Sequence, residues 1–458
     1  MRAFARQMTE RMKAVAAAGA VAAFWLAVWV FAAALVAQPL ILPGPGAVVV
    51  ALLRLVCDGS TWAILAGSGA RILGGLALAA VCGGVLAGIS SRSRAFARLV
   101  APVLSFVKAT PVACVVVLLL IWLGSARVSI AAVFLMALPG VYFSLVEGLA
   151  QVNKPLEQMF RLHGVRGWRL FCAHTWREVL PFVLSCARAV IGMSWKAGVA
   201  AELIGMAAGT VGERIYQAKL LIETADLLAW TVLVVAASWA CEHVLVWLLR
   251  VSGPVAWRAA VRAHGCGARG RAGAASDGTA AELALAVGDR APWAPALDGL
   301  VLRVPAGGRI CVMGASGAGK STLLALAAGE CAPCSMVFQD VRLVEDASAL
   351  DNVLVCADAR VDASSALALL RLLVPGVDVH ARVAELSGGQ RRRVEIARAL
   401  LCPGDAVILD EPFTGLDAAA RDACAEVVLD LLDGRMLLLA THDAADARAL
   451  NISDIITL

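Results

Sequence analysis

Long apolar segments dominate the first 250 residues of the chain. A helix needs about 20 predominantly apolar residues to cross the hydrocarbon core of a bilayer. Segments of this kind fall near residues 15–37, 64–89, 102–123, 130–149, 179–205 and 227–249. We therefore expect residues 1–250 to form an all-α domain of six transmembrane helices.

Basic residues between these segments favour one orientation in the membrane. Lys and Arg gather ahead of the first segment, in the connections 90–101 and 150–178, and after residue 250, whereas the intervening connections carry few. Cytoplasmic connections are typically the basic ones. The first segment is too long for the core of a signal peptide and is expected to remain as an anchor. The N-terminus, the 150–178 loop and the C-terminal part are therefore expected in the cytoplasm.

The apolar pattern changes after residue 250. Residues 251–282 are rich in Gly, Ala and Arg, which is typical of a flexible linker. Beyond them, short apolar runs alternate with helical stretches rich in Ala and Leu, as in a sheet with crossover helices. We expect residues 283–458 to form an α/β nucleotide-binding domain.

Composition supports two domains in two environments. The chain is 60% hydrophobic and 16% charged, with a mean hydropathy of +0.80, which argues against an ordinary soluble protein and excludes a disordered or collagenous one. Residues 1–250 carry 21 basic and 10 acidic side chains, whereas residues 283–458 carry 15 and 23. The basic excess therefore belongs to the apolar part and does not indicate nucleic-acid binding.

The 13 cysteines are dispersed through apolar stretches. Cys331 and Cys334 form a C-x-x-C pair, but a second pair that would complete a zinc site is missing. We interpret the cysteines as small apolar residues, and a redox or metal role for this pair stays open.

A glycine-rich loop lies in the context that a phosphate site requires. Residues 314–322 read GASGAGKST, after the strand-like segment 309–313 and before the helix-like segment 323–328. Glycines allow backbone amides to surround phosphates, a lysine reaches the outer phosphates, and the next hydroxyl holds Mg²⁺. The residues expected to bind the nucleotide are Gly314, Ser316, Gly317, Gly319, Lys320, Ser321 and Thr322.

A second element supplies two carboxylates. The apolar segment 406–409 ends in Asp410 and Glu411, which places one acid where it can bind Mg²⁺ and the next where it can polarise a water molecule. An apolar segment ending in two acids is common at solvated strand ends. Together with a phosphate loop about 90 residues upstream, it indicates phosphoryl transfer.

The C-terminal domain resembles the ATP-binding cassette (ABC) family, because residues 386–390 read LSGGQ. The other family motifs follow in order: the phosphate loop, Gln339 in VFQD, LDEP at 409–412, GLD at 415–417 and Thr441-His442-Asp443. The resemblance implies ATP and Mg²⁺ as cofactors. It implies Glu411 as the catalytic base, His442 at the γ-phosphate, and Mg²⁺ bound by Ser321, Asp410 and Gln339.

The same resemblance implies two further nucleotide contacts. Trp293 is similar to the aromatic residue that stacks on adenine, although an ordinary buried tryptophan is the alternative. The signature residues Ser387, Gly388, Gly389 and Gln390 complete the ATP site of a second cassette. A homodimer is therefore the simplest assembly, and a heterodimer with a similar fusion stays open. Only 17 positions separate Thr322 from Gln339, so we expect the antiparallel part of the cassette to be shortened.

The N-terminal half resembles permeases of binding-protein-dependent importers of the nitrate, taurine and sulfonate class. The resemblance rests on LPGPGAVVVALL at 42–53, TPVACVVVLLLIWLG at 110–124 and WKAGVAAELIG at 195–205. It implies ATP-driven import of a small solute that a periplasmic or lipid-anchored substrate-binding protein delivers, by an integral protein of a prokaryotic inner membrane. The alternative is a half-size exporter of a lipophilic substrate, whose membrane domain would be expected to be longer.

Permeases of this class insert a cytoplasmic loop into a cleft of the cassette. The resemblance places that loop at 150–178, with Gly164 retained and with Gln158, Met159 and Phe160 at the three leading positions. Arg161, Arg166 and Arg169 suit docking on the acidic cassette, and contact with lipid headgroups is the alternative. Within the membrane segments, Lys196 and Glu202 are expected either to line a pathway or to pair with each other.

Overall fold

The computed structural model describes residues 2–263, 283–287, 297, 299–315, 317–331 and 333–458. The chain divides into two compact units, one of Met1–Ala150 and Val179–Arg250 and the other of Gln151–Glu178 and Val251–Leu458. The expected order of an all-α region followed by an α/β domain is confirmed. The 150–178 loop, however, belongs to the second unit, together with the α/β domain.

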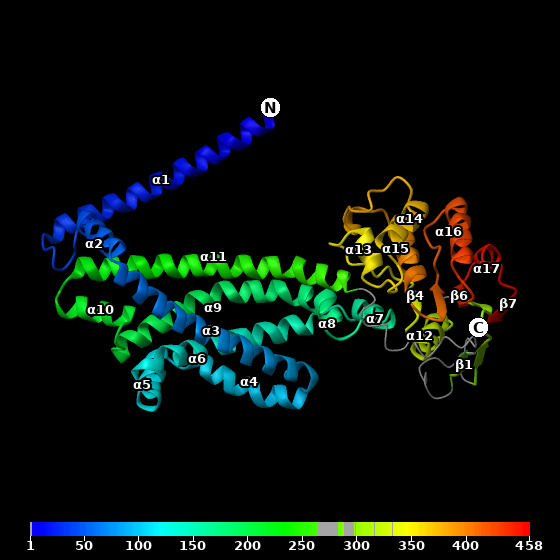
Figure 1. Cartoon of the computed structure of the whole chain (residues 1–458), viewed down its shortest axis with the longest axis horizontal. Helices are drawn as coiled ribbons and strands as arrows, with labels where there is room; N and C mark the ends of the chain where they lie inside the picture. Colours follow the sequence, from blue (N-terminus) through cyan, green and yellow to red (C-terminus); the bar gives the residue numbers. More distant parts are fainter. Residues whose placement is uncertain (1, 264–282, 288–296, 298, 316, 332) are drawn as a thin grey trace. The chain divides into compact units, whose positions relative to one another are not determined.

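The first unit is entirely helical in its described part (Figure 1). Its helices are α1 (Arg2–Val36), α2 (Pro45–Cys57), α3 (Gly59–Arg92), α4 (Arg94–Ala109), α5 (Val112–Leu123), α6 (Ser125–Ala150), most of α9 (Trp176–Gly205), α10 (Val211–Leu220) and most of α11 (Thr224–Arg262). Among the described residues, five helical segments are long and apolar enough to cross a membrane: Gly19–Val36, Gly59–Arg92, Ser125–Ala150, Gly167–Gly205 and Thr224–Arg262.

Small residues allow α3, α6 and α9 to pack closely. A Cβ atom at Gly75 of α3 would lie 2.5 Å from the carbonyl oxygen of Ile130 in α6, and one at Gly198 of α9 would lie 2.5 Å from Cγ1 of Ile72 in α3. Glycine at both positions therefore brings the helix backbones together, as is usual inside membranes.

The segment predicted as one helix near 102–123 is instead two helices. Helix α4 ends at Ala109, helix α5 begins at Val112, and the pair is bent by 103°. Pro111 disfavours helical geometry at Thr110 and has no N–H to donate. The Thr110 hydroxyl also donates to the carbonyl of Phe106, which satisfies one acceptor at the end of α4. The predicted segment is therefore not one continuous helix, although the pair can serve as one broken span.

The proposed linker also begins later than predicted. Helix α11 continues to Arg262, so 251–262 are helical and not a flexible tether. The reason is that Trp257 and Ala260 are buried in the core of the second unit, where their burial stabilises this last part of the helix. Residues 264–282 of the predicted linker lie outside the described residues.

The second unit is built around a parallel sheet. Its strands are β3 (Arg309–Met313), β4 (Ser335–Val337), β5 (Ala406–Asp410), β6 (Met436–Thr441) and β7 (Asp454–Thr457), in the spatial order β4-β5-β6-β3-β7. The described antiparallel part consists of β1 (Leu283–Ala286) and β2 (Val301–Val304). Helix α12 (Lys320–Glu330) leads directly from β3 to β4.

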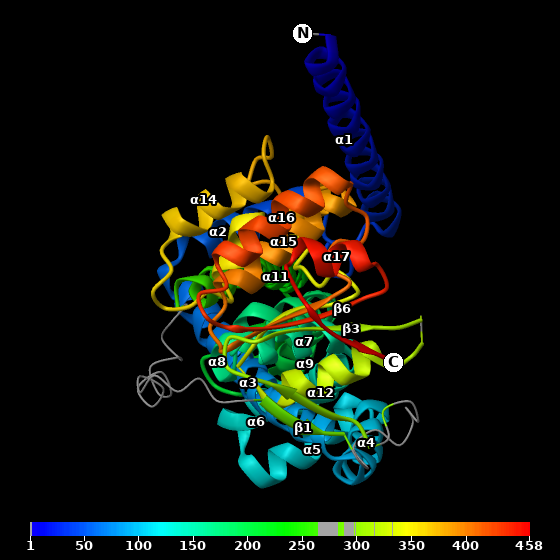
Figure 2. The same ribbon diagram turned by 90° about the vertical axis from the view of Figure 1, so that its right-hand side faces the viewer.

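Helices cover both faces of this sheet (Figure 2). Helix α12 packs on one face with Ile310 and Val312 of β3, whereas Cys311 of the same strand joins the core on the other face. The remaining elements are α13 (Ala349–Leu354), α14 (Ala363–Leu373), the 3₁₀ turn Val383–Glu385, α15 (Gly388–Leu401), α16 (Ala418–Asp430) and α17 (Ala444–Ala449). The segment predicted as the 150–178 loop contributes α7 (Lys154–Leu162), α8 (Gly167–Leu170) and a π-helical turn at Phe171–Thr175.

Candidate ATP site and coupling segment

The phosphate loop is a tight turn between β3 and α12. Gly317 and Gly319 have φ angles of +85° and +95°, a region that other residues adopt only with strain. Lys320 is 7% exposed and donates from Nζ to the carbonyl oxygens of Gly314 (2.8 Å) and Ala315 (3.0 Å). The loop thus holds a buried cation at the N-terminus of α12, the arrangement that binds phosphates. Ser316 lies outside the described residues.

Strand register brings the acidic residues to this loop. Met313 at the end of β3 pairs with Thr441 of β6, and Asp410 at the end of β5 pairs with Ala440 of β6. Because parallel strands end at one edge of the sheet, Asp410, Glu411 and His442 lie at the same edge as the phosphate loop.

Asp410 has the environment expected of a Mg²⁺ ligand. It is 3% exposed, and its Oδ1 atom has no hydrogen-bond partner among the described residues. Burial raises the pKa of this carboxyl, although the hydrogen bond with Ser321 opposes the shift. An orphaned carboxylate oxygen beside a hydroxyl and a lysine fits a bound cation, because hard cations such as Mg²⁺ prefer oxygen ligands.

Glu411 and His442 form a close pair at the sheet edge. His442 Nδ1 lies 2.8 Å from both carboxylate oxygens of Glu411, and this hydrogen bond raises the pKa of His442. Glu411 has a φ of +49°, an unusual conformation for a residue with a side chain. Its backbone N–H donates to Ala440 O at 2.9 Å, which holds the residue in that conformation. Such geometry is common at catalytic sites.

The signature segment is ordered by its own hydrogen bonds. Ser387 caps helix α15, because its hydroxyl accepts from Gln390 N and its own N–H donates to Gln390 Oε1 at 2.8 Å. Ser387 and Gly388 are exposed, and Gly389 and Gln390 are half-buried. Gln339 is exposed just after β4. Trp293 falls outside the described residues.

A buried ion network supports the segment that carries Gln339, and sequence analysis missed it. Glu395 and Arg398 have no exposed surface, and Arg392 is 4% exposed. Arg392 donates to the carbonyls of Phe338 and Gln339, while Glu395 accepts from Arg342 N at 3.0 Å. The spacing of three residues within RRRVEIAR is the only local signal for this network, because its backbone partners lie more than 50 residues away.

The loop predicted to couple the domains packs on the cassette mainly through apolar residues. Met159 and Phe160 of α7 are 1% and 0% exposed in a core shared with β4 and α12. The carbonyl of Leu162 accepts from Cys334 N at 3.0 Å. Gly164 has a φ of +78°, and a Cβ there would lie 3.5 Å from Pro333. We call residues 151–178 the coupling segment below.

The arginines of the coupling segment divide into two groups. Arg169 donates to Val355 O at 2.9 Å, and Arg342 of the cassette donates to Pro155 O and to Gln158 Oε1. Arg161 instead pairs with Glu157 of its own helix at 2.6 Å, and Arg166 is exposed. Of the three arginines expected to dock on the cassette, the structure brings Arg169 to it. Arg177, which was not among them, pairs with Asp346 of the cassette at 3.6 Å.

Glu202 and Lys196 are not paired with each other in the first unit. Glu202 has no exposed surface and accepts from Ser68 Oγ (2.8 Å) and Arg71 Nε (3.1 Å). Lys196 is exposed. The sequence analysis missed Arg71 because it lies 131 residues from Glu202 within an apolar segment.

Comparisons with known proteins agree with this architecture. Residues 80–256 match the family model of the binding-protein-dependent transport system inner membrane component, and residues 297–414 match the model of ABC transporters. The chain is similar to aliphatic sulfonates import ATP-binding protein SsuB 1 of Paracoccus denitrificans, with 34% identity over 179 residues that cover 36% of this chain and 72% of the relative. SsuB of Escherichia coli K12 is 36% identical over 34% of this chain and 68% of its own length.

Two further matches are a relative that is named for lipoprotein release and a solved ABC cassette. The lipoprotein-releasing system ATP-binding protein LolD of Xanthomonas axonopodis is 35% identical over 34% of this chain and 78% of its own length. A solved dimeric bacterial ABC transporter cassette is 25% identical over 36% of this chain and 86% of that chain, with a TM-score of 0.32.

The fold and the site thus define an ATP-hydrolysing transporter subunit, with a permease domain and an ATPase domain on one chain. The chain belongs to the ABC transporter family. It binds nucleotide and couples ATP hydrolysis to transport, and its permease domain makes it an integral membrane protein.

Proposed function

We propose that this chain is the fused permease and ATPase subunit of an importer for a small solute of the nitrate, taurine and sulfonate type. The observation that carries the proposal is the presence of both matches in one chain, the importer-type permease model over 80–256 and the ABC model over 297–414. The SsuB relatives, named for aliphatic sulfonate import, support the solute class. LolD is named for lipoprotein release, so resemblance of the cassette does not by itself choose the solute.

The described residues support a specific division of labour in ATP hydrolysis. Backbone amides of the loop around Gly317 and Gly319 bind the phosphates, and Lys320 turns its amine from two carbonyls to the outer phosphates. Ser321, Asp410 and Gln339 would hold Mg²⁺, which would supply positive charge to neutralise the phosphates. Glu411 orients and deprotonates the attacking water, and His442, held by Glu411, contacts the γ-phosphate.

Two copies of the chain complete two ATP sites in this proposal. Ser387 and Gly388 are exposed at the N-terminus of the 14-residue helix α15, where unsatisfied N–H groups attract anions. The phosphates are bound on one chain by the loop before α12, so the signature of a partner copy supplies the second half of the site. A symmetric homodimer then provides one translocation pathway on its two-fold axis. A heterodimer with a similar fusion would serve equally in this geometry.

We place the protein in the inner membrane of a prokaryote, with its N-terminus and cassette in the cytoplasm. The basic connections support this orientation. An extracytoplasmic binding protein, periplasmic or lipid-anchored, would deliver the solute on the other side. The coupling segment packs on the cassette and would pass the movements of the ATP cycle to the membrane helices.

The test is ATP turnover by the purified protein in lipid discs, with candidate binding proteins added with and without a sulfonate, taurine or nitrate ligand. We expect one ligand-loaded binding protein to stimulate turnover severalfold. Glu411→Gln should bind ATP without turning it over, and Lys320→Ala should fail to bind it. Stimulation by lipophilic compounds and by no binding protein would refute import in favour of a half-size exporter. Equal turnover by Glu411→Gln and the wild type would refute the assignment of the site.

A further inference from the structure

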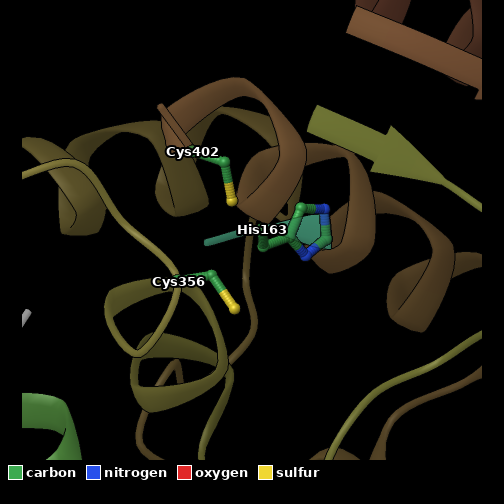
Figure 3. A group of neighbouring side chains, drawn as sticks. All are labelled: His163, Cys356 and Cys402. Atoms are coloured by element: carbon green, nitrogen blue, oxygen red, sulfur yellow. The ribbon is translucent and has the colours of Figure 1, made fainter. Parts of the chain in front are cut away.

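Three buried side chains from distant parts of the second unit meet beside the coupling segment (Figure 3). His163 follows α7, Cys356 lies just after α13, and Cys402 follows α15. The three residues are 2%, 2% and 3% exposed, and their potential ligand atoms all lie within 4.8 Å of one another. Figure 3 shows both sulfur atoms and the imidazole ring around a common space. Across the described residues, this is the one group of three or more such ligands found close together.

The imidazole ring of His163 is fixed against the backbone of Met336 in β4. Its Nε2 atom lies 3.2 Å from Met336 O and 3.1 Å from Met336 N, whose N–H donates to it when Nε2 carries no proton, and its buried Nδ1 atom has no hydrogen-bond partner in the described part of the chain. When the proton is on Nε2, that N–H donates to Met336 O and leaves the lone pair of Nδ1 free. Histidine ligands commonly donate their other ring N–H to a backbone carbonyl, which fixes the tautomer and the orientation of the ring.

The thiols have the electrostatic surroundings of metal ligands. Burial opposes ionisation of both, yet the neighbouring Cys402, His163 and Arg398 bring the pKa of Cys356 well below its usual value. Burial and the adjacent Cys356 raise the pKa of Cys402. Both thiols must be deprotonated to bind a cation, so binding would release protons.

We propose that His163, Cys356 and Cys402 form a binding site for one thiophilic metal ion, Zn²⁺ or Cu⁺. Both ions prefer thiolate and imidazole ligands. Two thiolates balance the charge of Zn²⁺, whereas with Cu⁺ one negative charge remains for the fully buried Arg398 to balance. Zn²⁺ ligands lie about 3.5–4 Å apart when each is 2.0–2.3 Å from the ion, so small side-chain rotations would close the observed group around it.

A metal ion at this site would cross-link the coupling segment to the cassette. His163 belongs to the segment, whereas both cysteines belong to the cassette, at the ends of the helices that precede and carry the signature region. The segment otherwise meets the cassette through apolar contacts, a few hydrogen bonds and the ion pair of Arg177 with Asp346 at 3.6 Å. Occupancy would therefore stabilise the contact that transmits ATP hydrolysis, and metal would act on coupling without touching the nucleotide.

The experiment uses the full-length protein in lipid discs, reduced and then freed of metal and reductant without oxygen. Zn²⁺ and Cu⁺ are titrated in separate arms, and Cd²⁺ serves as an optical probe of thiolate coordination. We expect one ion per chain, a thiolate charge-transfer band with Cd²⁺, and X-ray absorption that shows two sulfur ligands and one nitrogen ligand. The arm with the tighter binding identifies the ion.

Variants separate this site from the other cysteines. Cys356→Ser and His163→Gln should lose the tight ion and the rise in melting temperature that it gives to the wild type. Cys424→Ser removes a buried cysteine elsewhere in the same unit and should retain both. The X-ray absorption measurement needs no variant and stays informative if one of them fails to fold.

Three outcomes would overturn the proposal. The first is a wild-type protein that binds neither ion tightly, and the second is a charge-transfer band that persists in Cys356→Ser. The third is a disulfide between Cys356 and Cys402 in protein purified without added oxidant, which would make the pair a redox site instead. None of these outcomes depends on the transported solute, so failure here is distinguishable from failure of the proposed import function.

Discussion

Replacing Phe160 by Ala tests whether the coupling segment is held to the cassette by apolar burial. Phe160 has no exposed surface and lies in the core that also contains Leu323 of α12 and Met336 of β4. Phe-to-Ala changes in cores cost about 3–5 kcal/mol. Because this side chain joins α7 to the cassette, most of that loss should fall on the local opening of α7. Each 1.4 kcal/mol is a factor of ten in an equilibrium constant.

The matched control is Arg161→Ala in the same helix. Arg161 is 59% exposed along its side chain and pairs with Glu157 one turn earlier, a kind of contact worth about 0.3–0.5 kcal/mol. We expect hydrogen exchange of the amides in 156–165 to be about 100-fold faster or more in Phe160→Ala and nearly unchanged in Arg161→Ala.

The assay compares exchange and coupling in the same lipid discs. Phe160→Ala should keep ATP binding but lose stimulation by a loaded binding protein, because its α7 is detached more often. Arg161→Ala should keep both. Equal exchange rates in the two variants would refute the conclusion that burial of Phe160 holds the segment in place.

The remaining predictions concern the ATP site and the membrane helices. Gly319→Ala places a Cβ at φ +95° and 3.2 Å from Leu297, so it should destabilise the cassette by at least ~1 kcal/mol and weaken ATP binding. Gly329→Ala, in open space within helix α12 that follows Gly319, should be neutral or stabilising. Equal effects of the two changes in thermal unfolding and nucleotide titration would contradict this. Glu202→Gln removes the charge that Arg71 contacts and should lower the free energy of unfolding by roughly 1–3 kcal/mol, which is measured as a fall in Tm of a few degrees. Lys196→Met changes an exposed position and should leave Tm unchanged. Since Glu411 raises the pKa of His442, the attraction between them is fully present below the usual histidine pKa and is lost as pH rises through the raised value. NMR titration of labelled histidine should show the pKa of His442 falling in Glu411→Gln. An unchanged pKa would argue against the pair.

The sequence could predict those parts of the candidate site whose functional residues lie close together in the chain. The phosphate loop, the Asp410-Glu411 pair and the signature each occupy a few consecutive residues next to a strand or helix boundary. Their assembly at one sheet edge then follows from the rule that parallel strands end together. The break at Pro111 also has a local signal, but apolarity over the whole segment outweighed it in the prediction.

Contacts between distant residues had no such signal. Arg71 reaches Glu202 across 131 positions, and His163 reaches Met336 across 173. The arginines of the coupling segment are alike in sequence, and only the packing of the segment distinguishes Arg169, which reaches the cassette, from Arg161, which pairs within its helix. The helical extension of α11 to Arg262 depends likewise on burial of Trp257 in the second unit.

The two halves of the nucleotide site are prepared to different degrees before ATP arrives. The signature is already locked by reciprocal hydrogen bonds between Ser387 and Gln390, so it loses little conformational entropy when it meets a ligand. Lys320, in contrast, is engaged with the carbonyls of Gly314 and Ala315 and has to exchange these bonds for phosphate. In the homodimer proposed above, rearrangement would therefore be concentrated on the loop side. Each chain would first load its own nucleotide, and the partner's signature would then close on it as a rigid body.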